Sequence, residues 1–227
     1  EKALETARAA AERFPFIPRV WLELSDTCGR LDRIDEQIAA LTRALEINPG
    51  WSIAYQKLGL AHERRLDLEK ATHVYRRAVA ADPLDAHNRG FLADALWKLG
   101  RRDEAVTELT VALRLDPDYG WGWRQLQAWH RQLGTPDATI EAARRAAEAR
   151  AGEARGWMQL AGLLVEAQRL DDALDAAARA TTAEPRNPDT HDMRAWVLAR
   201  LHRFDEAKAA CRPEAFGETA PFTLRGR

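Results

Sequence analysis

The stretch that decides the fold is AHNRGFLADALWKLGRRDEAVTELTVALRLDPDY, residues 86–119. Its apolar residues recur at the three- and four-residue spacing of helices, over two segments that Leu99 and Gly100 separate. Pro117 closes the second segment, because its ring cannot continue a helix and disfavours helical geometry in the preceding residue. The stretch therefore predicts two helices joined by a tight turn.

The same pattern recurs along the chain with a period of 34 residues. A fixed period of this length is typical of a solenoid or another repeat array. Three residue types keep one phase: Pro15, Pro49, Pro83, Pro117 and Pro185; Leu24, Leu58, Leu92, Leu126 and Leu160; and Ala10, Ala44, Ala78, Ala112, Ala146 and Ala180. The sequence therefore predicts an all-α solenoid of stacked antiparallel helix pairs.

These residues resemble the tetratricopeptide repeat family, whose 34-residue unit carries an aromatic residue at position 4, Leu at 7, small residues at 8, 20 and 27, and Pro at 32. The resemblance implies a right-handed superhelix of about six units with truncated ends. Counted from Pro18 as position 1, the units are 18–51, 52–85, 86–119, 120–153 (where Ala151 replaces the closing proline), 154–187 and a degenerate unit at 188–219. Residues 1–17 would be the second helix of a truncated unit, and residues 220–227 the start of a further truncated helix.

The composition excludes several classes of protein. Lys and Arg number 34 and Asp and Glu number 35, and 34 − 35 gives a net charge of −1. Such a balance argues against nucleic-acid or anionic-membrane binding, which select a basic surplus. No apolar run approaches the roughly 18 residues that cross a bilayer, and the opening EKALETARAAAERF is too charged for a secretory signal. We expect a soluble, cytoplasmic protein without a membrane partner.

Residues that could carry chemistry form no catalytic or metal-binding pattern. No two of the six histidines have the i, i+4 spacing of a helical zinc site, and no phosphate-binding glycine loop occurs. His62 and His130 share repeat position 11, where we expect hydrogen-bonded interior imidazoles. Cys28 and Cys211 should act as small buried hydrophobes. The sequence thus predicts no catalytic residue, metal site or cofactor, and a protein that is not an enzyme.

The resemblance also implies which residues line the concave groove, because positions 2, 5, 9, 12 and 13 face it in this family. In the middle units these positions combine aromatic and basic residues, which are enriched at binding hot spots. The candidate peptide-binding groove comprises His87, Asp94, Trp97, Lys98, Trp121, Arg124, Arg131, Arg155 and Met158. In the sixth unit the same five positions carry Asp189, Asp192, Trp196, Ala199 and Arg200, which are not part of this candidate set. This set predicts binding of a peptide with acidic and bulky apolar side chains. In the alternative interpretation, Trp97 and Trp121 pack between repeats and the arginines form a solvated face.

Four function classes remain open. The first is a non-enzymatic scaffold with a protein or peptide partner. The second is a substrate-recruiting or regulatory arm of a larger enzyme. The third is a helical-repeat RNA binder of the pentatricopeptide kind, which the neutral charge opposes. The fourth is a protein of the prenyltransferase alpha-subunit kind, whose repeats Pro117, Trp121 and Trp123 faintly resemble. Uncapped solenoid ends also predict end-to-end self-association.

Overall fold

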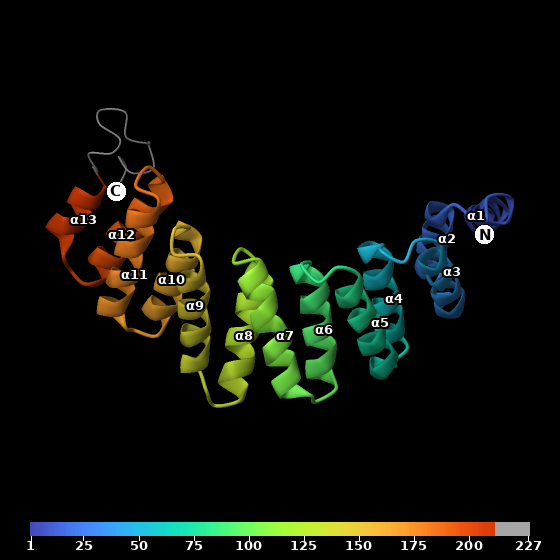
Figure 1. Cartoon of the computed structure of the whole chain (residues 1–227), viewed down its shortest axis with the longest axis horizontal. Coiled ribbons are helices and arrows are strands. Elements are labelled where there is room, and N and C mark those ends of the chain that lie inside the picture. The colour runs from blue at the N-terminus through green and yellow to red at the C-terminus, as the bar shows by residue number, and fades with distance from the viewer. Residues whose placement is uncertain (212–227) are drawn as a thin grey trace. The chain divides into compact units, whose positions relative to one another are not determined.

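The computed structural model describes residues 1–211, which form thirteen α-helices and no strand (Figure 1). Consecutive helices are joined by short turns and lie antiparallel within each pair (Figure 1). The helices are α1 (Lys2–Arg13), α2 (Pro18–Arg30), α3 (Ile34–Ile47), α4 (Ser52–Arg64), α5 (Leu68–Ala81), α6 (Ala86–Lys98), α7 (Arg102–Leu115), α8 (Gly120–Gln132), α9 (Asp137–Ala149), α10 (Ala154–Glu166), α11 (Leu170–Ala183), α12 (Pro188–Arg200) and α13 (Phe204–Ala210).

The chain divides into two compact units between Asp116 and Pro117. Helices α1 to α7 belong to the first unit and α8 to α13 to the second. Within each unit the helices pack as successive hairpins, so the predicted all-α solenoid of helix pairs is confirmed. The segment 220–227, expected to begin a further helix, lies outside the described residues.

The first helix of each hairpin begins 34 residues after the preceding one, at Pro18, Ser52, Ala86, Gly120, Ala154 and Pro188. Proline at the first helical position costs nothing, because the amide hydrogen it lacks would have no partner inside the helix. Pro18 and Pro188 use this position. In the fourth hairpin, Pro136 occupies the N-cap of α9, which begins at Asp137.

The turn inside each hairpin has one left-handed residue at repeat position 15. Their φ angles are 58° at Asp32, 61° at Leu66, 80° at Gly100, 74° at Gly134, 60° at Gln168 and 59° at His202. A residue with a Cβ pays about 1–2 kcal/mol for this conformation, whereas glycine adopts it freely. Sequence reveals the position only at Gly100 and Gly134, although all six hairpins use it.

A side chain at repeat position 4 ties most hairpins to the turn before them, by donating a hydrogen bond to the carbonyl six residues earlier. The pairs are Trp21 with Pro15 (3.0 Å), Arg89 with Pro83 (3.2 Å), Trp123 with Pro117 (2.9 Å), Trp157 with Ala151 (3.1 Å) and His191 with Pro185 (2.8 Å). The turn at Ala151 thus keeps the same bond without its proline.

The repeating leucines and alanines form the core of each unit. The leucines of the Leu24 series are at most 8% exposed, and the alanines from Ala44 to Ala180 are at most 4% exposed. Burying a leucine contributes about 1.5–3 kcal/mol, and the small alanines let helices approach closely. The sixth hairpin departs from the pattern at Arg194, whose buried Nε finds no hydrogen-bond partner in the described chain.

Candidate functional site

In the first unit, the charged side chain of the predicted groove residue Lys98 forms ion pairs with two neighbouring carboxylates. Its Nζ lies 2.5 Å from Glu63 Oε2 and 2.7 Å from Asp94 Oδ2. Burial alone would lower the pKa of Lys98, but Asp94 and Glu63 together raise it above its ordinary value. Tyr75 donates a hydrogen bond of 3.0 Å to the other oxygen of Glu63. Lys98 therefore has its charge compensated within the unit.

Other polar residues of the same helices pair across successive repeats. Lys57 Nζ lies 2.6 Å from Asp26 Oδ1, and Gln56 donates to Asn88 Oδ1 at 3.3 Å. Arg64 reaches Asp32 at 2.6 Å. The polar groups along the first helices of this unit therefore hold neighbouring hairpins together.

Two further predicted residues of the first unit have intramolecular contacts. The exposed His87 donates its backbone amide hydrogen to Asp85 at the start of α6. Trp97 is half-buried, and the guanidinium carbon of Arg102 lies 5.4 Å from its ring centroid. This contact lies within one hairpin, between α6 and α7, so both interpretations of Trp97 stay predictions.

In the second unit, α8 presents two arginines whose charge is not compensated in this way. Arg124 and Arg131 are exposed and form no ion pair within residues 1–211. Seven residues make about two helical turns, so the two side chains leave α8 in nearly the same direction, about 10 Å apart along its axis. Trp121, on the same helix, is half-buried with its ring centroid 5.5 Å from that of Tyr119. This helix face can bind carboxylates.

Two contacts join α8 to α10. Gln127 donates to Glu166 Oε2 at 2.6 Å, and Arg155 forms an ion pair with Asp118, which precedes α8. Arg155 is exposed, yet its guanidinium already has a carboxylate partner. Of the four predicted basic residues, Arg124 and Arg131 are thus the two without an ion pair in the part of the chain described.

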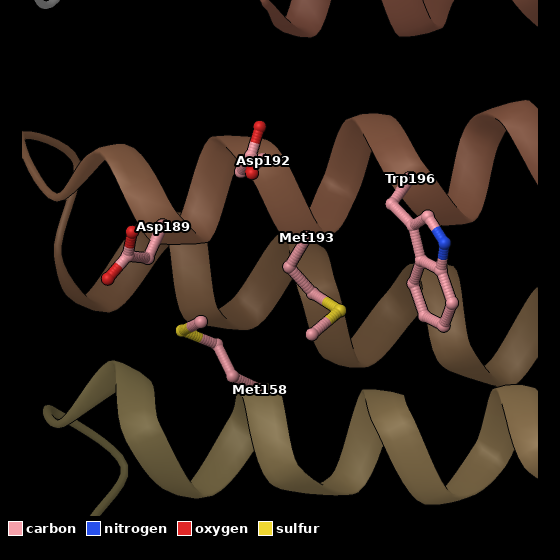
Figure 2. A pocket seen from close by; sticks show the side chains of 5 residues that line it. All are labelled: Met158, Asp189, Asp192, Met193 and Trp196. Atoms are coloured by element: carbon pink, nitrogen blue, oxygen red, sulfur yellow. The ribbon is translucent and has the colours of Figure 1, made fainter. Parts of the chain in front are cut away.

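Two adjoining pockets lie in the same unit, between the beginning of α8, at Gly120 and Trp123, and α12. The first has a volume of about 380 Å³ and is lined by residues that include Asp118, Arg155, Met158, Gly162 and Glu166. The second has about 420 Å³ and is lined by Met158, Asp189, Asp192, Met193 and Trp196 (Figure 2). Met158 and Met193 line both pockets, so the two form one continuous depression.

The predicted set is therefore divided between the two units. His87, Asp94, Trp97 and Lys98 lie in the first unit, and Trp121, Arg124, Arg131, Arg155 and Met158 in the second. Sequence reasoning missed Met193, which stands at repeat position 6 and not at a groove position. The pairing of the chain's two methionines across neighbouring repeats is the signal that could have found it.

The buried histidines and cysteines have structural surroundings. His130 Nδ1 lies 2.9 Å from Thr139 Oγ1, and burial lowers the pKa of both His130 and His62. Only His130 has the expected hydrogen bond at Nδ1, because the same atom of His62 is buried without a partner in the described chain. Burial raises the pKa of the Cys28 thiol, which disfavours a reactive thiolate. Residues 1–211 contain no group of side chains that could hold a metal ion, and none of their helices is long and apolar enough to cross a membrane.

The hairpins recur every 34 residues, and each contains the same left-handed turn. They define a helical repeat protein whose first helices carry the candidate binding face. Models of the tetratricopeptide repeat match residues 18–50 and 57–120. These two matches support a protein of the tetratricopeptide repeat family.

Two solved structures show the same fold. The crystal structure of MamA covers 74% of this chain and 92% of its own, with 19% identity and a TM-score of 0.50. The chain from the Cut9–Hcn1 hetero-tetramer of the APC/C covers 99% of this chain and 45% of its own, with 15% identity and a TM-score of 0.53. Both comparisons support the all-α repeat fold.

A curated relative, the TPR repeat-containing thioredoxin TTL4 of Arabidopsis thaliana, is 28% identical over 108 residues. The matched stretch is 48% of this chain and 15% of TTL4. The similarity therefore concerns a minor part of that relative.

Proposed function

We propose that this chain is a non-enzymatic protein-interaction scaffold that binds a peptide segment along the first helices of its second unit. Stacked helix pairs offer an extended surface for partners, and scaffolds of this family are generally not catalysts. The observation that carries the proposal is the pair of exposed arginines, Arg124 and Arg131, on the unit that also holds the continuous depression at Met158.

The chemistry of this surface indicates the character of the partner. Arg124 and Arg131 offer two guanidinium groups about 10 Å apart, which suits two carboxylates on one peptide. The half-buried Trp121 offers apolar contact area on the same helix, and Met158 of α10 lines the depression in the same unit. The site thus comprises Trp121, Arg124, Arg131, Arg155 and Met158, and takes a segment with acidic and bulky apolar side chains. We assign His87, Asp94, Trp97 and Lys98 to the flanking surface of the first unit, where Lys98 is compensated.

The test compares protein capture by the native chain and by an Arg124→Glu, Arg131→Glu variant from lysate of the source organism, with mass spectrometry of retained proteins. An Arg114→Glu, Arg144→Glu variant is the matched control, because both residues lie on second helices and neither forms an ion pair within residues 1–211. We expect the partner to be lost from the first variant and kept by the control. Equal retention by all three chains would contradict the site.

A second candidate function is a recruiting arm of a larger enzyme, and the similarity to TTL4 favours considering it, because that relative is named as a thioredoxin with repeats. In this case the same groove would deliver a substrate to a catalytic domain. The native chain would then capture proteins whose turnover by the parent enzyme falls when Arg124 and Arg131 are reversed in charge. Unchanged turnover would contradict the recruiting function and leave the scaffold function as the remaining candidate.

A further inference from the structure

The depression in the second unit extends beyond Arg155 to a second end, whose lining contains no basic residue. Its far part lies between α10 and α12, where the side chains of Met158 and Met193 both extend into the space between the two helices (Figure 2). These are the two methionines of the whole 227-residue chain. Methionine is flexible and polarizable, so a pair of them forms an adaptable apolar floor for a long side chain.

The rim of this part is acidic and aromatic. Asp189 and Asp192 stand one turn apart on α12, and Trp196 follows one turn further. Asp189 is exposed and forms no ion pair within the described residues. Its backbone amide donates to Asn187 Oδ1 at the N-cap of α12, which fixes the start of the helix beneath it.

The indole ring of Trp196 has a guanidinium group of the same helix against it. The guanidinium carbon of Arg200 lies 5.7 Å from the Trp196 ring centroid, and the indole remains 37% exposed. Cations bind to indole faces because the π-system is electronegative there. Asp189 therefore favours a positively charged group and the methionines favour its aliphatic stem, whereas Trp196, two turns further along α12, adds an aromatic wall at the other end of the pocket.

We propose that the pocket of Met158, Asp189, Asp192, Met193 and Trp196 is a subsite for an arginine or lysine side chain of the bound peptide. The proposal rests on the proposed function, and it gives the groove a polarity. The segment would place its carboxylates at α8 and its basic residue at α12.

The spacing of the helices sets the distance between these two ends of the peptide. Packed helices such as α10 and α12 lie about 8–10 Å apart, and a similar step from α8 to α10, which Gln127 and Glu166 bridge, gives a span of about 20 Å. An extended peptide covers that distance in about six residues, at about 3.3 Å per residue. The groove thus selects a segment with an acidic residue and a basic residue about six positions apart.

The experiment selects random twelve-residue peptides displayed on phage against the folded full chain, and then against three variants. Asp189→Lys reverses the exposed charge at the subsite, and Arg124→Glu, Arg131→Glu changes the other end. Asp175→Lys is the matched control, because Asp175 is exposed on α11 and forms no ion pair within residues 1–211. Circular dichroism confirms that each variant folds.

We expect peptides selected by the native chain to be enriched in Arg or Lys about six positions from Asp or Glu. Asp189→Lys should abolish the basic enrichment and keep the acidic one, whereas Asp175→Lys should keep both. A fluorescein-labelled selected peptide should bind the Asp189→Lys variant about tenfold more weakly, and replacing its basic residue by Met should remove that difference. A Met158→Ala variant, with the pocket floor shortened, should also weaken that peptide.

Two results would overturn the subsite: no basic enrichment with the native chain, or equal enrichment with Asp189→Lys and Asp175→Lys. Failure of the proposed function gives a different result. In that case the acidic enrichment would be absent or unaffected by the Arg124→Glu, Arg131→Glu variant, while the basic enrichment still depended on Asp189.

Discussion

Replacing Gly59 by alanine should destabilise the first unit although alanine is the better helix former. Gly59 lies on α4 against Tyr75 of α5, and a Cβ built there would stand 2.2 Å from the ring atom Cε1 and 2.7 Å from the hydroxyl oxygen. The ring cannot retreat, because Tyr75 is 0% exposed and stacks on Phe91 with the ring centroids 5.5 Å apart. The methyl group must therefore displace a side chain that is held on several sides.

The magnitude follows from three effects. Alanine gains about 1 kcal/mol of helix propensity over glycine. Overpacking a core of this kind costs about 1–3 kcal/mol. A displaced Tyr75 also weakens its hydrogen bond to Glu63, and a hydrogen bond to a charged group contributes about 1.5–3 kcal/mol. We therefore expect the free energy of unfolding to fall by about 2 kcal/mol, since the two losses outweigh the gain.

Urea denaturation followed by circular dichroism measures this change. Gly162→Ala is the control, because a Cβ at Gly162 meets no atom within 4 Å and should raise stability by up to about 1 kcal/mol. In a Tyr75→Leu background, where the ring is absent, Gly59→Ala should no longer be destabilising. A Gly59→Ala variant as stable as the native chain would refute the argument that the tyrosine ring requires glycine.

Four further predictions follow from the repeat geometry and the buried groups. Gly100→Ala should lower the free energy of unfolding by about 1 kcal/mol, because the φ of 80° at Gly100 is left-handed, although an added Cβ would contact no atom. Leu66→Gly should raise the melting temperature, because glycine relieves the same strain at φ 61°. Trp157→Phe should cost about 1–2 kcal/mol in thermal or urea unfolding, since it loses the bond to the Ala151 carbonyl and some packing, and an unaltered midpoint would contradict the role of that bond. Burial lowers the folded-state pKa of His62 and His130 below 6.5, so the unfolded chain binds more protons, and the unfolding free energy should hold above about pH 6.5 and fall as the pH drops below it. A His62→Leu, His130→Leu variant should show a shallower profile. End-to-end self-association stays a prediction, which sedimentation equilibrium at high concentration tests against a strict monomer.

The fold could be predicted from the sequence because the core residues are periodic. The buried positions of Leu58 and Ala78 and the turn position of Pro83 recur in most hairpins, so each repeat is evidence for the others. The intra-hairpin turn could be read only where it carries glycine, at Gly100 and Gly134. At Leu66 and Gln168 the chain accepts the left-handed strain, because packing of the two helices outweighs about 1–2 kcal/mol, and local sequence shows nothing of it.

The candidate site was less predictable, because periodicity gives the direction of a side chain but not its partner. Lys98 and Arg124 stand at groove positions of neighbouring units and have the same charge. Lys98 meets Glu63 and Asp94, whereas Arg124 has no ion pair in residues 1–211. The difference depends on residues about one repeat away, such as Glu63, whose side chain reaches Lys98 only after the hairpins stack. A charge at a groove position is therefore available for binding only when the preceding and following repeats leave it uncompensated. This criterion selects Arg124, Arg131 and Asp189 in the second unit, and it predicts that Lys98 becomes available only when Glu63 and Asp94 are both neutralised, because each carboxylate lies within ion-pair distance of its Nζ.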